Sequence, residues 1–101
     1  KEGMIPLLGA IKREDLPMVK KILRSGAQIN LVNNQGLTPL MHAARIGNFD
    51  LVRILVDSGA SMAPSKSGDF RGLRALDMAE FYLNQKVANF LRLKMDWPLV
   101  D

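Results

Sequence analysis

The sequence predicts an all-α solenoid of three helix–turn–helix units with short hairpin-like connecting loops. The first observation is a repeat, because an offset of 33 residues carries Gly3 onto Gly36 and Gly26 onto Gly59. The second is that Leu, Ile and Val recur along the whole chain of 101 residues, which is long enough for one domain only. The third is that no stretch alternates apolar and polar residues with the period of a strand.

The repeat extends over whole units rather than isolated positions. Segment 3–7 aligns with 36–40, and the Ser-Gly-Ala of 25–27 aligns with that of 58–60. A weaker third copy starts at Gly72 with an offset of 36, so about three residues are inserted within 62–71. We therefore expect a single domain, 1–101, with repeats at about 3–35, 36–71 and 72–95 and a C-terminal tail at 96–101.

The second unit shows how each unit folds. Thr38 can cap the first helix, and Pro39 suits the first helical position because its missing N–H has no partner there. Gly47 ends that helix, Asn48 can cap the next one over 49–57, and Gly59 closes it. In unit one, Asp15 is the equivalent cap, which is a simpler role for it than membership of an acid/base pair with Glu14.

Apolar residues cover nearly the whole circumference of 49–57, so this helix must lie between neighbours. At the corresponding positions the end units change character. Lys21 stands where the other units have Ile54 and Phe90, and Arg92 stands where they have Leu23 and Val56. Polar outer faces are typical of terminal repeats, so we expect the array to stop after unit three and the tail containing Trp97 to fold over the last helix.

The pattern Gly-Leu-Thr-Pro-Leu at 36–40, followed by Ala43-Ala44, Gly47, Leu51-Val52 and Ser-Gly-Ala at 58–60, resembles an ankyrin repeat. The resemblance covers essentially the whole chain. Units one and three depart from it, with Glu14 in place of the inter-helix glycine and Arg74-Ala75 in place of Thr-Pro. The resemblance implies a non-enzymatic scaffold or adaptor domain that binds a partner protein.

Composition excludes several other functions. The chain has no cysteine and one histidine, His42, without a second metal ligand at a suitable spacing, so we expect no metal, no cofactor and no catalytic residue. We expect His42 to be a satisfied structural residue and the serines at 65 and 67 to belong to an ordinary loop. The net charge of +4 is small, and the basic residues are scattered along the chain. No apolar run is long enough to span a membrane. Absence of cysteine fits an intracellular setting, cytoplasmic or nuclear.

In ankyrin repeats, partners contact the hairpin tips and the exposed ends of the first helices. Carried over by alignment, these positions in the present sequence are Lys12, Arg13, Asn34, Gln35, Leu37, Arg45, Ile46, Phe70, Arg71, Leu73, Phe81 and Tyr82. Basic residues gather at one end of this set and aromatic residues at the other. We expect a groove that accepts a protein or peptide with acidic and apolar residues, within a larger multidomain chain.

Other functions remain open from the sequence. The basic charge could bind nucleic acid or another polyanion, although its scatter makes nucleic acid the weaker expectation. The domain could also serve only as a structural or intramolecular docking unit. Phe70, Phe81, Tyr82 and Trp97 could form an aromatic cage for methylated lysine, with Asp69 or Asp77 supplying a carboxylate, or Phe81 and Tyr82 could simply cap the core.

Overall fold

The computed structural model describes residues 4–94, with side chains from residue 6 onward. The tail 96–101, including Trp97, therefore lies outside the described residues. The helices are α1 (Met4–Lys12), α2 (Leu16–Arg24), α3 (Pro39–Ile46), α4 (Phe49–Asp57), α5 (Ala75–Phe81) and α6 (Gln85–Lys94). A 3-10 turn, η1 (Gly68–Phe70), lies between α4 and α5. The described residues contain no strand, but both links carry short hairpin-like backbone pairings, such as the Asn33 N–H with the Leu37 carbonyl oxygen at 3.0 Å and the Ser65 N–H with the Leu73 carbonyl oxygen at 2.8 Å.

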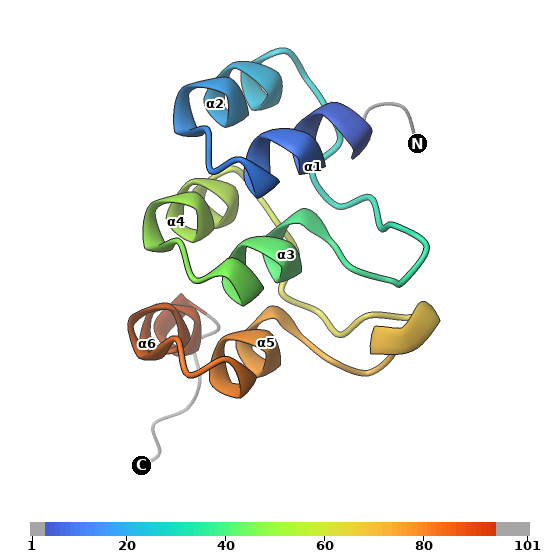
Figure 1. Ribbon diagram of the computed structural model, residues 1–101, viewed down its shortest axis with the longest axis vertical. Helices are drawn as coiled ribbons and strands as arrows, with labels where there is room; N and C mark the ends of the chain where they lie inside the picture. The colour runs from blue at the N-terminus through green and yellow to red at the C-terminus, as the bar shows by residue number, and fades with distance from the viewer. Residues whose placement is uncertain (1–3, 95–101) are drawn as a thin grey trace.

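The helices form two layers that run the length of the molecule (Figure 1). The inner layer contains α1, α3 and α5, where α3 contacts both of the others. The outer layer contains α2, α4 and α6, where α4 contacts both of the others. Within each unit the two helices are antiparallel neighbours joined by a short turn, so the predicted all-α solenoid of helix–turn–helix units is confirmed.

The predicted helix caps of unit two are formed. The Thr38 hydroxyl oxygen accepts a hydrogen bond from the Met41 N–H at 3.1 Å, and Pro39 opens α3. The Asn48 side-chain oxygen accepts from the Leu51 N–H at 3.1 Å and caps α4. Each cap satisfies a backbone donor that the helix itself leaves without a partner.

In the outer units, different residues cap the helix starts. In unit one, the Asp15 carboxylate accepts from the Met18 N–H at 3.2 Å and caps α2, as predicted. In unit three, Arg74 replaces the capping threonine, and the start of α5 is held by Asp77 instead. The Asp77 carboxylate accepts from the backbone N–H of Arg74 at 2.8 Å. A carboxylate in the first turn also interacts favourably with the helix dipole.

The core is continuous through all three units and is centred on α3. Five of the eight residues of α3 are buried, because α1 and α5 cover its two sides. The ring of Phe49 on α4 meets that of Phe90 on α6 edge to face, with centroids 5.2 Å apart. Burying a large aliphatic side chain contributes about 1.5–3 kcal/mol, so stacking of units is the main source of stability.

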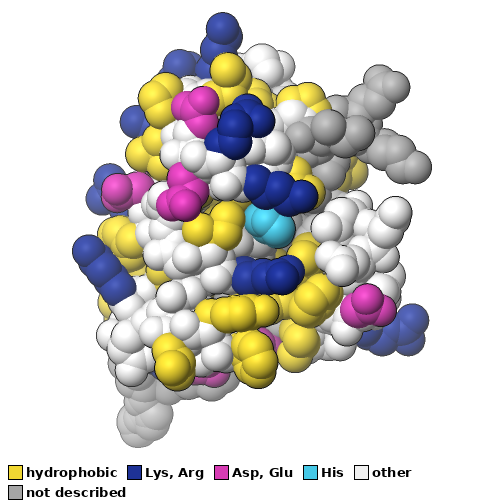
Figure 2. Space-filling model, in the orientation of Figure 1, with side chains coloured by type: hydrophobic (Ala, Val, Ile, Leu, Met, Phe, Trp, Pro, Cys, Tyr) yellow, Lys and Arg dark blue, Asp and Glu magenta, His cyan; other side chains and the backbone are white. Residues whose placement is uncertain are grey.

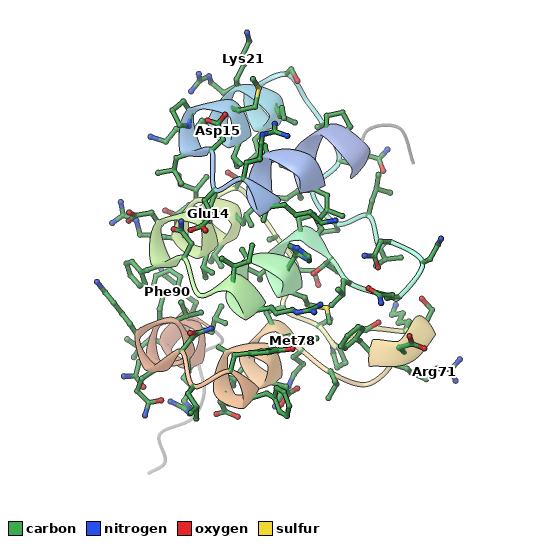
Figure 3. The ribbon with its side chains drawn as sticks, viewed as in Figure 1. Glu14, Asp15, Lys21, Arg71, Met78 and Phe90 are labelled. Atoms are coloured by element: carbon green, nitrogen blue, oxygen red, sulfur yellow. The ribbon has the colours of Figure 1, made fainter. Side chains whose placement is uncertain are left out.

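Charged side chains lie at both ends of the array at the positions where the sequence predicts them. Lys21 is exposed and points away from the array (Figure 3). On the opposite end, Arg92 forms an ion pair with Glu80, and its guanidinium also donates to the Asn89 side chain at 2.9 Å. The polar character expected at the positions of Lys21 and Arg92 is therefore present in the structure.

The inserted segment between α4 and α5 is anchored rather than loose. Ser65 is buried, and its hydroxyl donates to the Gly36 carbonyl oxygen at 2.8 Å. The Ser65 backbone pairs with Leu73 and Gly72, each at 2.8 Å. A side chain at Gly36 would overlap the carbonyl oxygen of Ser67, so glycine is required there. Ser65 lies in a loop, as expected, and this loop packs on the preceding link.

The turn between the two helices of each unit uses a left-handed backbone residue. Gly47 has φ +87° and ends α3, as predicted. The equivalent residues in the outer units are not glycine, yet Glu14 has φ +56° and Leu83 has φ +60°. A side chain in this conformation costs about 1–2 kcal/mol, so both outer turns hold local strain that packing of the units overcomes.

We expect Leu83→Gly to stabilise the domain. Leu83 is 85% exposed, so its removal sacrifices little packing while the strain is relieved. Glycine makes the unfolded chain more flexible, so the net gain should be about 0.5–1 kcal/mol. The measurement is the urea midpoint of unfolding. Leu83→Ala is the matched control, since it keeps the Cβ atom, and equal midpoints for the two variants would contradict the argument.

Candidate functional site

The candidate surface is formed where the inner helices end, because the same repeat position projects there from each unit. Lys12, Arg45 and Phe81 are equivalent by the offsets of 33 and 36 residues and lie at the C-terminal ends of α1, α3 and α5. The next position holds Arg13, Ile46 and Tyr82. We call these six residues the helix-end surface.

An apolar pocket adjoins the helix-end surface at unit three. It has a volume of about 330 Å³ and is lined by Phe70, Leu73, Asp77, Met78, Phe81 and Tyr82. Phe81 is 77% exposed, and its ring meets that of Tyr82 edge to face at 5.0 Å. Phe70 is half-buried and packs against the core from the inserted loop. The structure therefore brings four of the predicted partner-contacting residues, Phe70, Leu73, Phe81 and Tyr82, around one cavity.

Asp77 lines this pocket, but its charge is already engaged. Its carboxylate accepts from the Arg74 side chain at 3.1 Å and 3.2 Å, in addition to the backbone hydrogen bond. These hydrogen bonds with Arg74 hold the pKa of Asp77 below its usual range, and burial opposes them. The carboxylate thus serves the start of α5, and the remainder of the pocket offers an apolar surface.

Arg45 connects the apolar pocket to the basic part of the helix-end surface. Its guanidinium lies over the Tyr82 ring, 5.8 Å from the centroid. In the part of the chain that the structure describes, the ion pairs are Arg74–Asp77 and Arg92–Glu80, so no described carboxylate pairs with Arg45 or Lys12. Stacking on an aromatic ring positions an arginine while leaving its N–H donors available to an acceptor.

His42 lies on α3 between Lys12 and Arg45. Burial, followed by the charges of Lys12 and Arg45, lowers the pKa of His42 below its ordinary value of 6.5, so the ring is neutral at neutral pH. In Figure 2 the histidine lies between basic side chains above and below it, and hydrophobic side chains gather below the lower one. Its buried Nδ1 has no hydrogen-bond partner among the described residues, so the expectation of a fully satisfied histidine is wrong.

The remaining predicted residues lie at the links and do not all reach the surface. Leu37 is fully buried in the core and offers no contact area, which corrects its expected partner role. It is buried because the link enters α3 here, where the Leu37 N–H donates to the Asn33 side chain at 3.0 Å. Asn34 and Gln35 are exposed, and the Gln35 carbonyl accepts from the Phe70 N–H at 3.2 Å. Arg71 is exposed at the far side of the inserted loop, away from α5 (Figure 3).

Sequence reasoning missed three features of this surface. Met78 was not expected to line a pocket, the hydrogen bonding of Asp77 to Arg74 was not foreseen, and His42 was not placed beside Lys12 and Arg45. The repeat alignment contained a signal for the last of these, because Lys12 and Arg45 are equivalent positions and His42 lies three residues before Arg45. Of the residues suggested for an aromatic cage, Phe70, Phe81 and Tyr82 line this pocket, Asp77 is engaged by Arg74, and Trp97 lies outside the described residues.

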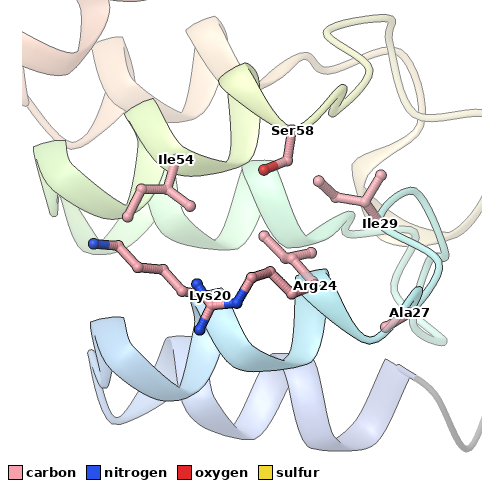
Figure 4. Close-up of a pocket in the computed structure, with 7 residues that line it drawn as sticks. Lys20, Arg24, Ala27, Ile29, Ile54 and Ser58 are labelled. Carbon is pink, nitrogen blue, oxygen red and sulfur yellow. The ribbon is translucent and has the colours of Figure 1, made fainter.

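A second cavity lies between α2 and α4 on the outer layer (Figure 4). It has a volume of about 290 Å³, with Lys20 and Arg24 from α2 and Ile54 and Ser58 from the α4 side among its lining residues. Arg24 lies in the last turn of α2, where positive charge stabilises the helix dipole, so its presence needs no ligand.

Two further observations concern the described residues as a whole. Residues 4–94 contain no group of three or more His, Cys, Asp or Glu side chains placed to hold a metal ion. No helix in this part of the chain is long and apolar enough to cross a membrane.

Stacked helix pairs with an inner and an outer layer define the molecule as a helical repeat protein. The profile of the ankyrin repeats, in three copies, matches residues 7–98. The chain therefore belongs to the ankyrin repeat family, whose members are in general non-enzymatic protein-interaction modules.

Curated relatives match short stretches of much longer proteins. The ankyrin repeat, SAM and basic leucine zipper domain-containing protein 1 of Ornithorhynchus anatinus is 46% identical over 57 residues, which are 56% of this chain and 12% of that protein. The ankyrin repeat and SAM domain-containing protein 6 of Mus musculus is 36% identical over 83 residues, which are 81% of this chain and 9% of that protein. The chain thus spans only about a tenth of the length of these relatives.

A solved structure shares the fold over most of the chain. It is that of a predatory endopeptidase from Bdellovibrio bacteriovorus in complex with an immunity protein. The match has a TM-score of 0.76 and 29% sequence identity, and it covers 88% of this chain and 45% of the matched chain.

We expect His42 to make the stability of the domain depend on pH. Its pKa is lower in the folded protein than in the unfolded chain, so the unfolded chain takes up the proton first as the pH falls. The stabilising contribution is complete above pH 6.5 and decreases as the pH falls below that value. Urea unfolding at about pH 7.5 and about pH 5.5 should show a larger loss for the wild type than for His42→Gln. Equal losses would show that His42 does not titrate as described.

Proposed function

We propose that this domain is a non-enzymatic protein-binding module, acting as a scaffold or adaptor, that holds a partner through the helix-end surface and the apolar pocket beside it. The observation that carries the proposal is the pairing of this pocket with Arg45, which no described carboxylate neutralises. The partner segment should contain both apolar and acidic residues.

The residue types at this surface support the proposal. Aromatic residues and arginine dominate the binding energy of many protein interfaces, and Phe81, Tyr82 and Arg45 lie together here. An aromatic side chain as exposed as Phe81 is unusual for a residue that serves only the core. Membership of the ankyrin repeat family and the likeness to a structure solved as a protein complex agree with this role.

The distribution of charge favours a protein partner over a polyanion. Lys86 and Lys94 on α6 lie over the rings of Phe49 and Phe90, at 4.6 Å and 5.6 Å from the centroids. Lys20 and Arg24 lie on another part of the outer layer. A nucleic-acid binder gathers its basic residues on one face, whereas these are spread over both layers.

The setting of the domain is part of the proposal. The relatives are many times longer than this chain and are named for further domains, which supports a place in a larger multidomain protein. The absence of cysteine supports an intracellular location, cytoplasmic or nuclear.

We expect the triple variant Arg45→Glu/Phe81→Ala/Tyr82→Ala to lose the specific partner. The variant reverses the charge beside the pocket and removes two of its aromatic walls, so binding should weaken by at least about 2 kcal/mol, or about thirtyfold. The measurement is affinity capture from nuclease-treated lysate, followed by titration of the captured protein against wild type and variant.

The matched control is Arg53→Glu/Leu93→Ala. Both of these residues are exposed on the outer layer, so the control reverses one arginine charge and truncates one exposed apolar side chain away from the proposed surface. Thermal melts would establish that all three proteins fold. Retention of the same partner by the triple variant at unchanged affinity would rule the surface out.

A further inference from the structure

The helix-end surface repeats the same two positions in each unit, and the first of them gives one side chain per unit in a fixed order. Along the equivalent position the order is Lys12, Arg45 and Phe81, which is cation, cation and aromatic ring. The three helices that carry them lie side by side, with α3 in contact with α1 and α5 (Figure 1). Because the repeat fixes the register, a bound segment that crosses these helices meets the three groups at regular intervals.

The spacing of the helices selects the conformation of such a segment. Packed helices lie about 8–10 Å apart. In an extended β-strand, side chains on one face recur at about 7 Å and about 13 Å, and neither distance equals the spacing between neighbouring helices. In a polyproline II helix the side chain recurs on the same face every three residues, or about 9 Å. A bound polyproline II segment can therefore place every third side chain against successive inner helices.

The charges on this side of the molecule determine which residues fit. Two acidic groups on this side have partners among the described residues: Asp77 is paired with Arg74, and the Glu14 carboxylate accepts a hydrogen bond from the Asn48 side chain at 2.9 Å. Lys12 is exposed, Arg45 is held over Tyr82, and neither forms an ion pair with a described residue. Two acidic side chains are needed to complement them, and the pocket beside Phe81 takes an apolar one.

We infer that the partner segment is a polyproline II stretch in which one bulky apolar residue and two acidic residues follow one another at intervals of three. The apolar residue enters the pocket at Phe81 and Tyr82, the first acidic residue pairs with Arg45, and the second pairs with Lys12. This inference rests on the proposed function and adds the chemistry and spacing of the partner to it.

Fluorescence anisotropy with synthetic peptides tests the spacing. The probe is a fluorescein-labelled peptide with the order Phe-Pro-Pro-Glu-Pro-Pro-Glu, made also in the reverse order because the structure does not fix the chain direction. The control has the same composition with the two glutamates adjacent, Phe-Pro-Glu-Glu-Pro-Pro-Pro. One of the two spaced peptides should bind at least about fivefold more tightly than the control, as expected for a displaced ion pair.

A charge exchange tests the assignment to Arg45. Arg45→Glu should weaken the spaced peptide, and replacing its central glutamate with lysine should restore binding to this variant. Arg53→Glu, on the outer layer, should leave the affinity unchanged. Replacing the peptide phenylalanine with alanine should weaken binding by about tenfold, because the apolar pocket then stays empty.

The results that would contradict this inference differ from those that would contradict the proposed function. Equal affinity of spaced and adjacent peptides, or absence of rescue by the lysine peptide, would overturn the inference. If neither peptide binds, the inference is again overturned, while capture of a partner that the triple variant loses would still support the protein-binding role. Only a partner retained by the triple variant would overturn that role as well.

Discussion

Burial of α3 between α1 and α5 is the interaction on which the rest of the structure depends. Five of the eight residues of this helix are buried, and no single helix pair could cover them alone. A repeat unit has two apolar sides, and only its neighbours can bury them. The stability of the array therefore depends on the sum of the contributions of its interfaces. The same stacking fixes the register of the units, so equivalent positions at the helix ends are aligned on one surface.

In unit two the capping and turn residues favour the backbone conformations that packing requires, whereas in the outer units the turn residues do not. Thr38, Gly47 and Asn48 suit the caps and turn that they form. Glu14 and Leu83 adopt the left-handed conformation of Gly47 although their side chains disfavour it. Packing of the helices on either side of each turn contributes more than the turn costs, so the fold tolerates poor local sequence at its ends. This tolerance explains how the outer units can depart from the repeat pattern while keeping its shape.

The residues at the helix ends can vary because they lie outside the buried core that the units share. The position shared by Lys12, Arg45 and Phe81 carries cations in two units and an aromatic ring in the third, and in each unit it is helical. Around these residues the structure limits competing charge. Arg74 engages Asp77 inside the pocket, and burial keeps His42 neutral between Lys12 and Arg45. The surface therefore has an apolar part and a basic part in direct contact, which is a chemically selective arrangement rather than a general attraction for anions.

The sequence by itself determined the period of the repeat, the helix caps and the helical class, because these depend on residues within a few positions of one another. It also placed Arg45, Phe81 and Tyr82 at exposed helix ends, since the repeat alignment transfers such positions directly. Tertiary structure alone decided that Leu37 is buried, that Ser65 bonds to Gly36, and that Asp77 lines a pocket yet is engaged by Arg74. These outcomes depend on how the links and the inserted segment pack across units, and contacts between residues far apart in the chain leave no periodic pattern in the sequence.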